Sequence, residues 1–128
     1  MSYDRSNIFA RMLRREIPAR IIFENEYIFA CHDIFPRAPI HALAIPKGTY
    51  TEAHDFLTCA PDDHIVGFYR GLAHIIGLLG VKESGFRLVS NSGAHAHQEV
   101  PHFHIHILGG VRLGVIESIL PNTAPETY

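Results

Sequence analysis

The residues from His102 to Leu108 alternate between histidine and an apolar residue and end in two apolar residues. This alternation has the period of a β-strand, in which successive side chains point to opposite faces of a sheet. It predicts a strand over 102–108 with one apolar face that a core or a helix covers, the face of Phe103, Ile105 and Ile107. The other face carries His102, His104 and His106, with neighbouring rings about 7 Å apart.

Three histidines on one strand face indicate chemistry on phosphate. A neutral imidazole can attack as a nucleophile, donate to phosphate oxygens and pass a proton to a leaving group. A lone histidine on a strand is usually a half-buried polar residue, but packing does not explain three of them opposite an apolar face. We therefore predict a catalytic row in which His104, the middle ring, attacks phosphorus.

A zinc site is the alternative interpretation of the same residues. A His-x-His pair on a strand can place two nitrogens on zinc, with a third from His41 or His95. No carboxylate or cysteine lies at ligand spacing nearby in the sequence, and there is no HExxH motif. These features favour the phosphate interpretation, so no metal is expected.

The composition limits the partners of the chain. Its 128 residues give room for a single domain, 1–128. With 11 basic and 13 acidic side chains, it offers no basic stripe for a polynucleotide backbone. No apolar run approaches the ~20 residues that span a bilayer, and two cysteines make no disulfide framework. We expect a cytoplasmic protein with neither nucleic-acid polymers nor membranes as partners.

The order of the predicted elements indicates an α+β domain with an antiparallel sheet. A first helix is expected from a cap at Asp4 or Ser6 until Pro18, and further helices over 51–57 and 61–79. Strands are predicted over 21–23, 27–31, 41–45, 86–89 and 102–108. Two prolines make residues 33–39 a loop, and an apolar run at 115–120 precedes a loose end at 121–128.

The histidine row resembles the signature of the histidine triad (HIT) superfamily: His, apolar, His, apolar, His, apolar, apolar. The resemblance covers residues 7–114, and the order of the segments is that of the Hint-like branch, which comprises purine nucleoside phosphoramidases. The segments that carry it are Ile8-Phe9, Arg15-Glu16-Ile17-Pro18-Ala19, His32-Asp33-Ile34, His41-Ala42-Leu43-Ala44-Ile45-Pro46-Lys47, Asn91 and Gln98-Glu99-Val100.

This resemblance implies a HIT-like fold. The family has a five-stranded antiparallel sheet with one long helix and one or two shorter ones. Two copies form a homodimer whose two sheets join into one. For this chain the resemblance implies a core over 7–114 and a variable tail over 115–128.

The resemblance also implies roles for individual residues. His104 is the nucleophile that forms a nucleotidyl-histidine, and His106 contacts the phosphate and assists the leaving group. His102 and His41 would hold His104 in its reactive tautomer and orientation, and Asp33 would accept hydrogen bonds from the ribose. The other implied nucleotide-binding residues are Ile8, Phe9, Met12, Ile34 and Leu43 around the purine, Asn91 and Glu99 at the phosphate, and His32, Gln98 and Val100. Glu99 stands where branch members often have a serine.

The implied activity is that of a hydrolase or transferase acting on a purine nucleoside monophosphate or its conjugates. It would cleave a nucleoside 5′-phosphoramidate, or a related ester or anhydride, through a nucleotidyl-histidine and without a cofactor. Two alternatives stay open: a dinucleoside polyphosphate hydrolase, and a nucleotide-sensing module with little turnover.

Overall fold

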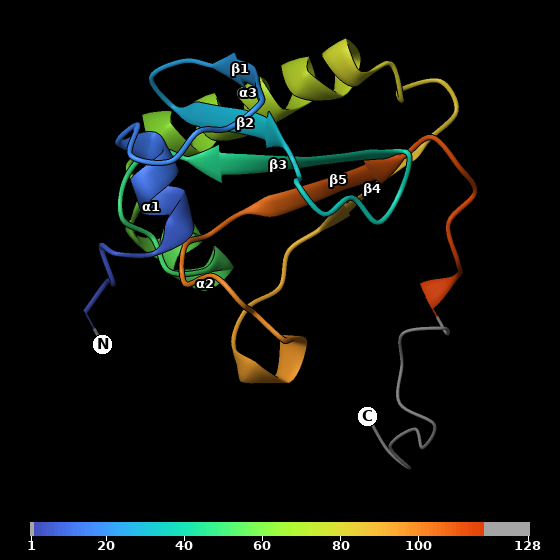
Figure 1. Cartoon of the computed structure of the whole chain (residues 1–128). Helices are drawn as coiled ribbons and strands as arrows, with labels where there is room; N and C mark the ends of the chain where they lie inside the picture. The colour runs from blue at the N-terminus through green and yellow to red at the C-terminus, as the bar shows by residue number, and fades with distance from the viewer. Residues whose placement is uncertain (1, 117–128) are drawn as a thin grey trace.

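Five strands and three α-helices make up residues 2–116, the part of the chain that the computed structural model describes (Figure 1). The strands are β1 (Ile21–Glu24), β2 (Ile28–His32), β3 (Ile40–Pro46), β4 (Phe86–Val89) and β5 (Ile105–Gly109). The helices are α1 (Ile8–Leu13), α2 (Ala53–Cys59) and α3 (Asp62–Leu79), with a short 3₁₀ helix η1 (Ala94–Ala96). None of these helices has the length and apolarity needed to cross a bilayer. The predicted end at 121–128 and most of the run at 115–120 lie outside the described residues.

The strands form one sheet in the order β1-β2-β3-β5-β4, and every neighbouring pair is antiparallel. This confirms the predicted five-stranded antiparallel sheet with one long and two short helices. The central strands β3 and β5 pair so that Leu43 lies opposite His106 and Ala44 opposite Ile105. Because opposite residues share a face, this register decides which side chains of the two strands meet.

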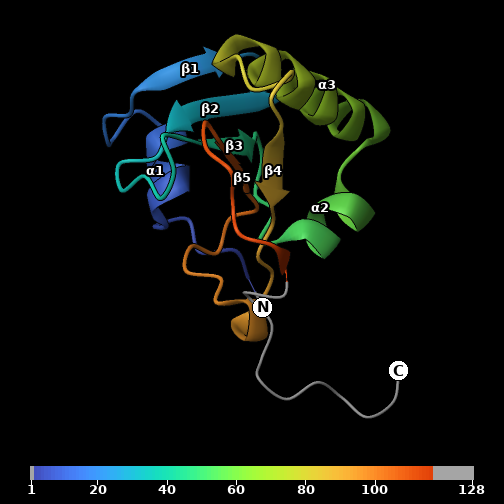
Figure 2. The same ribbon diagram turned by 90° about the vertical axis from the view of Figure 1, so that its right-hand side faces the viewer.

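Both faces of the sheet are covered, with α1 on one side and α2 and α3 on the other (Figure 2). The predicted apolar face of the histidine segment is confirmed: Phe103, Ile105 and Ile107 belong to the core cluster under α2 and α3. The second cluster lies under α1 and includes Phe9 and Leu43. Helix α3 approaches the sheet closely at Gly71, where an added Cβ would lie 2.6 Å from the side chain of Ile28.

The last strand begins at Ile105 and not at His102 as predicted. The preceding residues bond elsewhere, since His102 N–H donates to Val100 O at 2.8 Å and Phe103 N–H to Tyr50 O at 2.7 Å. Phe103 still packs with Ile105 in the same cluster. The alternation of faces therefore continues through a segment that has no ladder partner.

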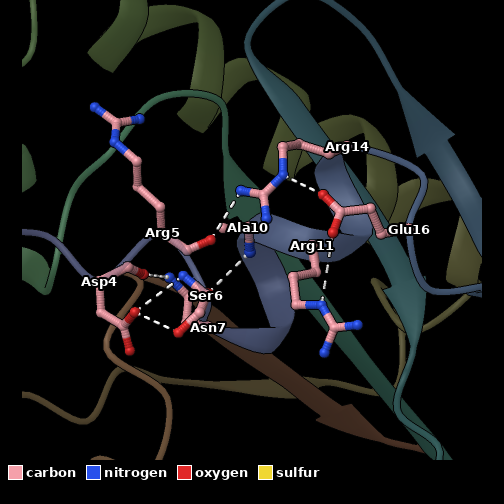
Figure 3. Close-up of polar contacts among 8 residues, drawn as sticks. All are labelled: Asp4, Arg5, Ser6, Asn7, Ala10, Arg11, Arg14 and Glu16. Carbon is pink, nitrogen blue, oxygen red and sulfur yellow. Dashed lines mark hydrogen bonds and ion pairs between the residues drawn. The ribbon is translucent and has the colours of Figure 1, made fainter.

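Helix α1 begins after Asn7, whose side chain caps it by accepting from Ala10 N–H at 2.8 Å (Figure 3). The predicted caps were wrong. The Asp4 carboxylate instead accepts from the backbone N–H of Ser6 at 2.9 Å, in the turn before the helix. The helix also ends before Pro18, since Arg14 is its C-cap and Arg15 adopts a left-handed φ of 64°.

Replacing the cap should weaken the fold measurably. We expect Asn7→Ala to lower the free energy of unfolding by about 1 kcal/mol. The reason is that the backbone N–H of Ala10 loses the acceptor that the buried Asn7 side chain provides. Ser6→Ala removes a hydroxyl that is exposed, and serves as the control. Urea denaturation of both variants measures the difference, and equal losses would contradict the assignment of Asn7 as the cap.

Candidate active site

Four histidine rings gather where β3 meets β5 and the segment before it. The ring centroids of His41 and His106 lie 5.1 Å apart, and so do those of His104 and His106. Phe9 of α1 makes an edge-on contact with His104, with ring centroids 4.8 Å apart. The β3–β5 register brings these residues together although 65 positions separate His41 from His106.

His102 is the fully buried ring of the four. Its Nε2–H donates to Pro46 O at 3.1 Å, because a carbonyl oxygen can only accept. Its Nδ1 therefore has a free lone pair, to which the Tyr3 hydroxyl donates. Burial lowers the pKa of His102 to about 4, so the ring is neutral at pH 7.

The hydrogen bonds of His104 determine which of its nitrogens is free. Its Nδ1–H donates to the backbone carbonyl of His102 at 2.7 Å, so in the neutral ring Nε2 carries the lone pair. This Nε2 has no hydrogen-bond partner. Among the described residues, every buried side-chain nitrogen and oxygen has a partner, so Nε2 is not buried and reaches solvent. Burial lowers the pKa of His104, which keeps this nitrogen unprotonated.

His106 presents the opposite chemistry. The backbone N–H of Arg37 donates to Nδ1 of His41 at 3.0 Å, so neutral His41 carries its hydrogen on Nε2. That Nε2–H donates to Nδ1 of His106 at 2.9 Å, which leaves the hydrogen of His106 on Nε2. Burial, and then the repulsion that protonated His104 and His41 rings would exert, lower the pKa of His106 to about 4. The ring of His41 thus contacts His106 and not His104.

Asp33 lies directly after β2, beside this pair. Its backbone N–H donates to His41 O at 3.0 Å, and its Oδ1 accepts from Phe35 N–H at 2.8 Å. Its Oδ2 lies 3.4 Å from Nε2 of His41. The tertiary structure therefore brings a carboxylate to the histidines, which the sequence spacing did not indicate.

Asp33, His41 and His106 offer three ligand atoms within 4.8 Å of one another, the one such group among residues 2–116. This set differs from the zinc ligands considered from the sequence, and His95 is exposed on η1. A metal at Nε2 of His41 would have to displace the hydrogen on that nitrogen. The hydrogen could not move to Nδ1 of the same ring, because Nδ1 accepts the hydrogen bond from Arg37 N–H. The arrangement therefore suits a hydrogen-bond relay better than a metal centre.

The other predicted binding residues fall into four groups. Phe9, Met12 and Leu43 share the buried cluster beside the histidines, and Val100 packs against it. Ile8 and Ile34 are exposed, and Asn91 and Glu99 lie on the segment before β5. Gln98 holds the loop itself, since its amide donates to Thr51 O at 2.7 Å and its oxygen accepts from Gly93 N–H at 2.9 Å.

His32 is not brought to the histidine row. It pairs with Ala42 of β3, and Ala42 belongs to the core cluster on the opposite face of the sheet. Two residues that sequence reasoning missed, Tyr3 and Arg37, do contact the row. Neither carries a sequence signal: Tyr3 contacts His102, 99 positions away, and Arg37 contributes only a backbone N–H, which any residue but proline has.

The buried neutral histidines couple folding to pH. His102 has a pKa of about 4 in the folded protein, against ~6.5 for an exposed imidazole. Between these values the unfolded chain binds more protons, so stability is complete above about pH 6.5 and falls as the pH drops toward 4. We expect a loss of roughly 3 kcal/mol from this residue over that window.

Urea denaturation between pH 4 and 7 measures this loss. His102→Gln should flatten the dependence of the unfolding free energy on pH, whatever its effect on stability at pH 7. A slope that stays the same in His102→Gln would show that other groups are responsible.

Comparisons with known proteins agree with this geometry. A model of the HIT domain matches residues 14–113. The chain is 47% identical over 113 residues to an uncharacterised HIT-like protein of Azospirillum brasilense, covering 88% of this chain and 93% of that one. It is 38% identical over 108 residues to the purine nucleoside phosphoramidase of Escherichia coli, covering 84% and 89%.

Solved structures show the same relationship. A HIT family hydrolase from Clostridium thermocellum superposes with a TM-score of 0.77 at 34% identity, covering 86% of this chain and 95% of that one. A histidine triad protein from Clostridium difficile gives 0.78 at 32% identity, covering 89% and 98%. The resemblance carried by the histidine row is thus confirmed over nearly the whole chain, and the protein belongs to the HIT family.

Proposed function

We propose that this protein is a nucleotide-binding hydrolase that cleaves nucleoside 5′-phosphoramidates through a nucleotidyl-histidine at His104. One observation carries the proposal: neighbouring rings expose complementary nitrogens, a lone pair on Nε2 of His104 and a hydrogen on Nε2 of His106. A nucleophile and a proton donor side by side are what displacement at phosphorus requires. The similarity to the Escherichia coli purine nucleoside phosphoramidase supports the choice of substrate.

In the first step, Nε2 of His104 attacks the α-phosphorus and the bond from phosphorus to the amine breaks. The amine takes one proton from Nε2 of His106, and solvent supplies a proton to that nitrogen in exchange, so the ring is neutral again after the step. The nucleotidyl ring of His104 is then positively charged, and its Nδ1–H already donates to the His102 carbonyl, which stabilises that charge. In the second step, water attacks phosphorus, the bond from phosphorus to Nε2 of His104 breaks, the nucleoside monophosphate leaves and one proton returns to solvent.

The proposal includes binding roles for the residues around the row. The purine would lie against Phe9, Met12 and Leu43, which already form one apolar cluster. Asn91 and the backbone at Glu99 would bind the phosphate. We propose that no cofactor takes part, because each proton and electron pair of the two steps has a donor or acceptor among the rings and water.

We also propose that the protein acts as a homodimer in the cytoplasm. Strand β4 is an edge of the sheet, and Phe86 and Leu88 expose 40% and 42% of their surface there. An apolar edge strand is a template for pairing with a second copy. Sedimentation would test this pairing, with a species of twice the 14.4 kDa chain expected.

The proposed function is tested with purified protein and adenosine 5′-phosphoramidate, with and without a chelator. We expect chelator-independent release of AMP and a transient mass increase of one nucleotide on the intact protein. Tight AMP binding without turnover would support a nucleotide sensor instead. Faster cleavage of a dinucleoside polyphosphate would reassign the leaving group, and loss of activity with the chelator would contradict the metal-free route.

Asp33 provides a separate prediction about the ribose. We expect Asp33→Ala to weaken the binding of AMP by at least about tenfold, because hydroxyl-to-carboxylate hydrogen bonds contribute about 1.5–3 kcal/mol. The binding of 2′,3′-dideoxy-AMP should change much less. Calorimetric titration of both ligands measures the two effects, and equal weakening would assign Asp33 only its contact with His41.

A further inference from the structure

Tyr3 lies outside the histidine row, but its hydroxyl reaches it. The residue stands before α1, and it precedes residues 14–113, over which the chain matches the HIT domain. Its hydroxyl donates to Nδ1 of His102, and the two rings meet edge-on with centroids 5.6 Å apart. Burial raises the pKa of Tyr3, so the hydroxyl keeps its hydrogen at neutral pH and acts as the donor.

The ring of His102 is held at both of its nitrogens. Nε2–H donates to Pro46 O at 3.1 Å, and the Tyr3 hydroxyl is the partner of Nδ1. Two bonds at different ring atoms fix the rotation of the imidazole, which one bond alone leaves free. Without the hydroxyl, a buried lone pair loses its partner, and the ring relieves this unfavourable state by turning or by admitting water.

His102 is also the residue that holds the nucleophile. Its backbone carbonyl accepts from Nδ1–H of His104 at 2.7 Å, the bond that leaves the lone pair of His104 on Nε2. The ring of His102 and this carbonyl are attached to the same Cα atom. Phe9 packs edge-on against both rings, with centroids 6.5 Å from His102 and 4.8 Å from His104. A movement of the His102 ring therefore reaches His104 through the chain and through Phe9.

We propose that Tyr3 is a positioning residue, which fixes His102 and thereby orients His104 for attack on phosphorus. The inference rests on the proposed function, in which Nε2 of His104 is the nucleophile. Tyr3 touches none of the reacting atoms, because its hydroxyl is bonded to His102. Misplacing a catalytic group slows the chemical step. The contribution of Tyr3 therefore belongs to kcat and not to nucleotide binding.

Tyr3→Phe removes the hydroxyl and keeps the ring beside His102. We expect kcat for adenosine 5′-phosphoramidate to fall about tenfold, the size of effect that one buried hydrogen bond has. The dissociation constant of AMP should stay close to the wild-type value, because the proposed purine cluster and Asp33 are intact. Steady-state kinetics and calorimetry measure the two quantities.

Tyr69→Phe is the matched control. It removes a hydroxyl by the same substitution from a ring that is 40% exposed on α3, which covers the face of the sheet opposite α1. Both kcat and the dissociation constant of AMP should keep their wild-type values.

A double-mutant cycle assigns the loss of kcat to His102. Leucine offers no acceptor to the hydroxyl, so in a His102→Leu background Tyr3→Phe should leave kcat unchanged. A hydroxyl that only stabilised the segment before α1 would lower kcat by the same factor in both backgrounds.

Nitrogen-15 NMR of the histidine rings gives a readout that does not depend on turnover. A hydrogen bond to a bare ring nitrogen shifts the resonance of that nitrogen. In Tyr3→Phe the Nδ1 signal of His102 should therefore move toward the position of an unbonded lone pair, while Nε2 keeps the hydrogen that it donates to Pro46 O.

The outcomes separate this inference from the proposed function. Wild-type kcat in Tyr3→Phe, an equal loss of kcat in the His102→Leu background, or an unchanged Nδ1 signal would each overturn the role of Tyr3 and leave the proposed function standing. If the wild type cleaves no phosphoramidate, the proposed function fails and the kinetic role of Tyr3 fails with it, whereas the NMR shift still decides whether Tyr3 holds His102.

Discussion

Replacing His104 with alanine is expected to lower kcat/KM for adenosine 5′-phosphoramidate by at least about 10³-fold, the scale of losing a catalytic nucleophile. The reason is that Nε2 of His104 is the ring nitrogen of the row that has both a lone pair and no partner. The free Nε2 of His106 carries a hydrogen, and both nitrogens of His102 and of His41 are hydrogen-bonded. Binding of AMP should change only a few-fold, because the apolar cluster and Asp33 remain. Steady-state kinetics and calorimetry measure the two quantities.

The control for this experiment is His54→Ala, which removes an exposed ring from α2 by the same substitution. It should retain wild-type turnover. Intact-protein mass spectrometry adds a direct readout, since the nucleotide adduct seen on the wild type should be missing from His104→Ala. Full turnover by His104→Ala would end its assignment as the nucleophile.

The second large effect concerns the core that supports the histidines. We expect Phe103→Ala to lower the free energy of unfolding by about 3–5 kcal/mol, as buried phenylalanines do when they leave a cavity. Phe103 is 2% exposed, stacks on Phe56 with ring centroids 5.0 Å apart, and contacts Phe68 at 5.6 Å. Because Phe103 lies between His102 and His104 in the chain, its loss should also make the positions of these two histidine rings less well defined.

Phe35→Ala is the matched control, since this ring is 76% exposed and the same substitution leaves no cavity. It should cost less than about 0.5 kcal/mol. Guanidinium denaturation of both variants provides the comparison. A loss below about 1 kcal/mol for Phe103→Ala would mean that the core can close around the missing ring.

Much of the fold could be predicted from local pattern. The alternation over 102–108 predicted which side chains face the core and which face the site, and this held although the regular strand starts at Ile105. Phe103 packs in the same core cluster as Ile105 and Ile107 without belonging to the strand, because a regular strand also needs ladder partners. The start of α1 was missed because several polar residues before it could cap, and only backbone geometry chose Asn7.

The candidate site was predictable as a set of residue types but not as a set of contacts. The sequence determined that three histidines share one face, because that follows from a period of two. The β3–β5 register decided that His41 meets His106, and the loop after β2 decided that Asp33 and Arg37 meet His41. The first contact joins residues 65 positions apart, and the other two depend on how the loop folds against β3. They fix the tautomers, and hence which nitrogen can attack, because a ring nitrogen is a donor or an acceptor according to the partner that the tertiary structure supplies.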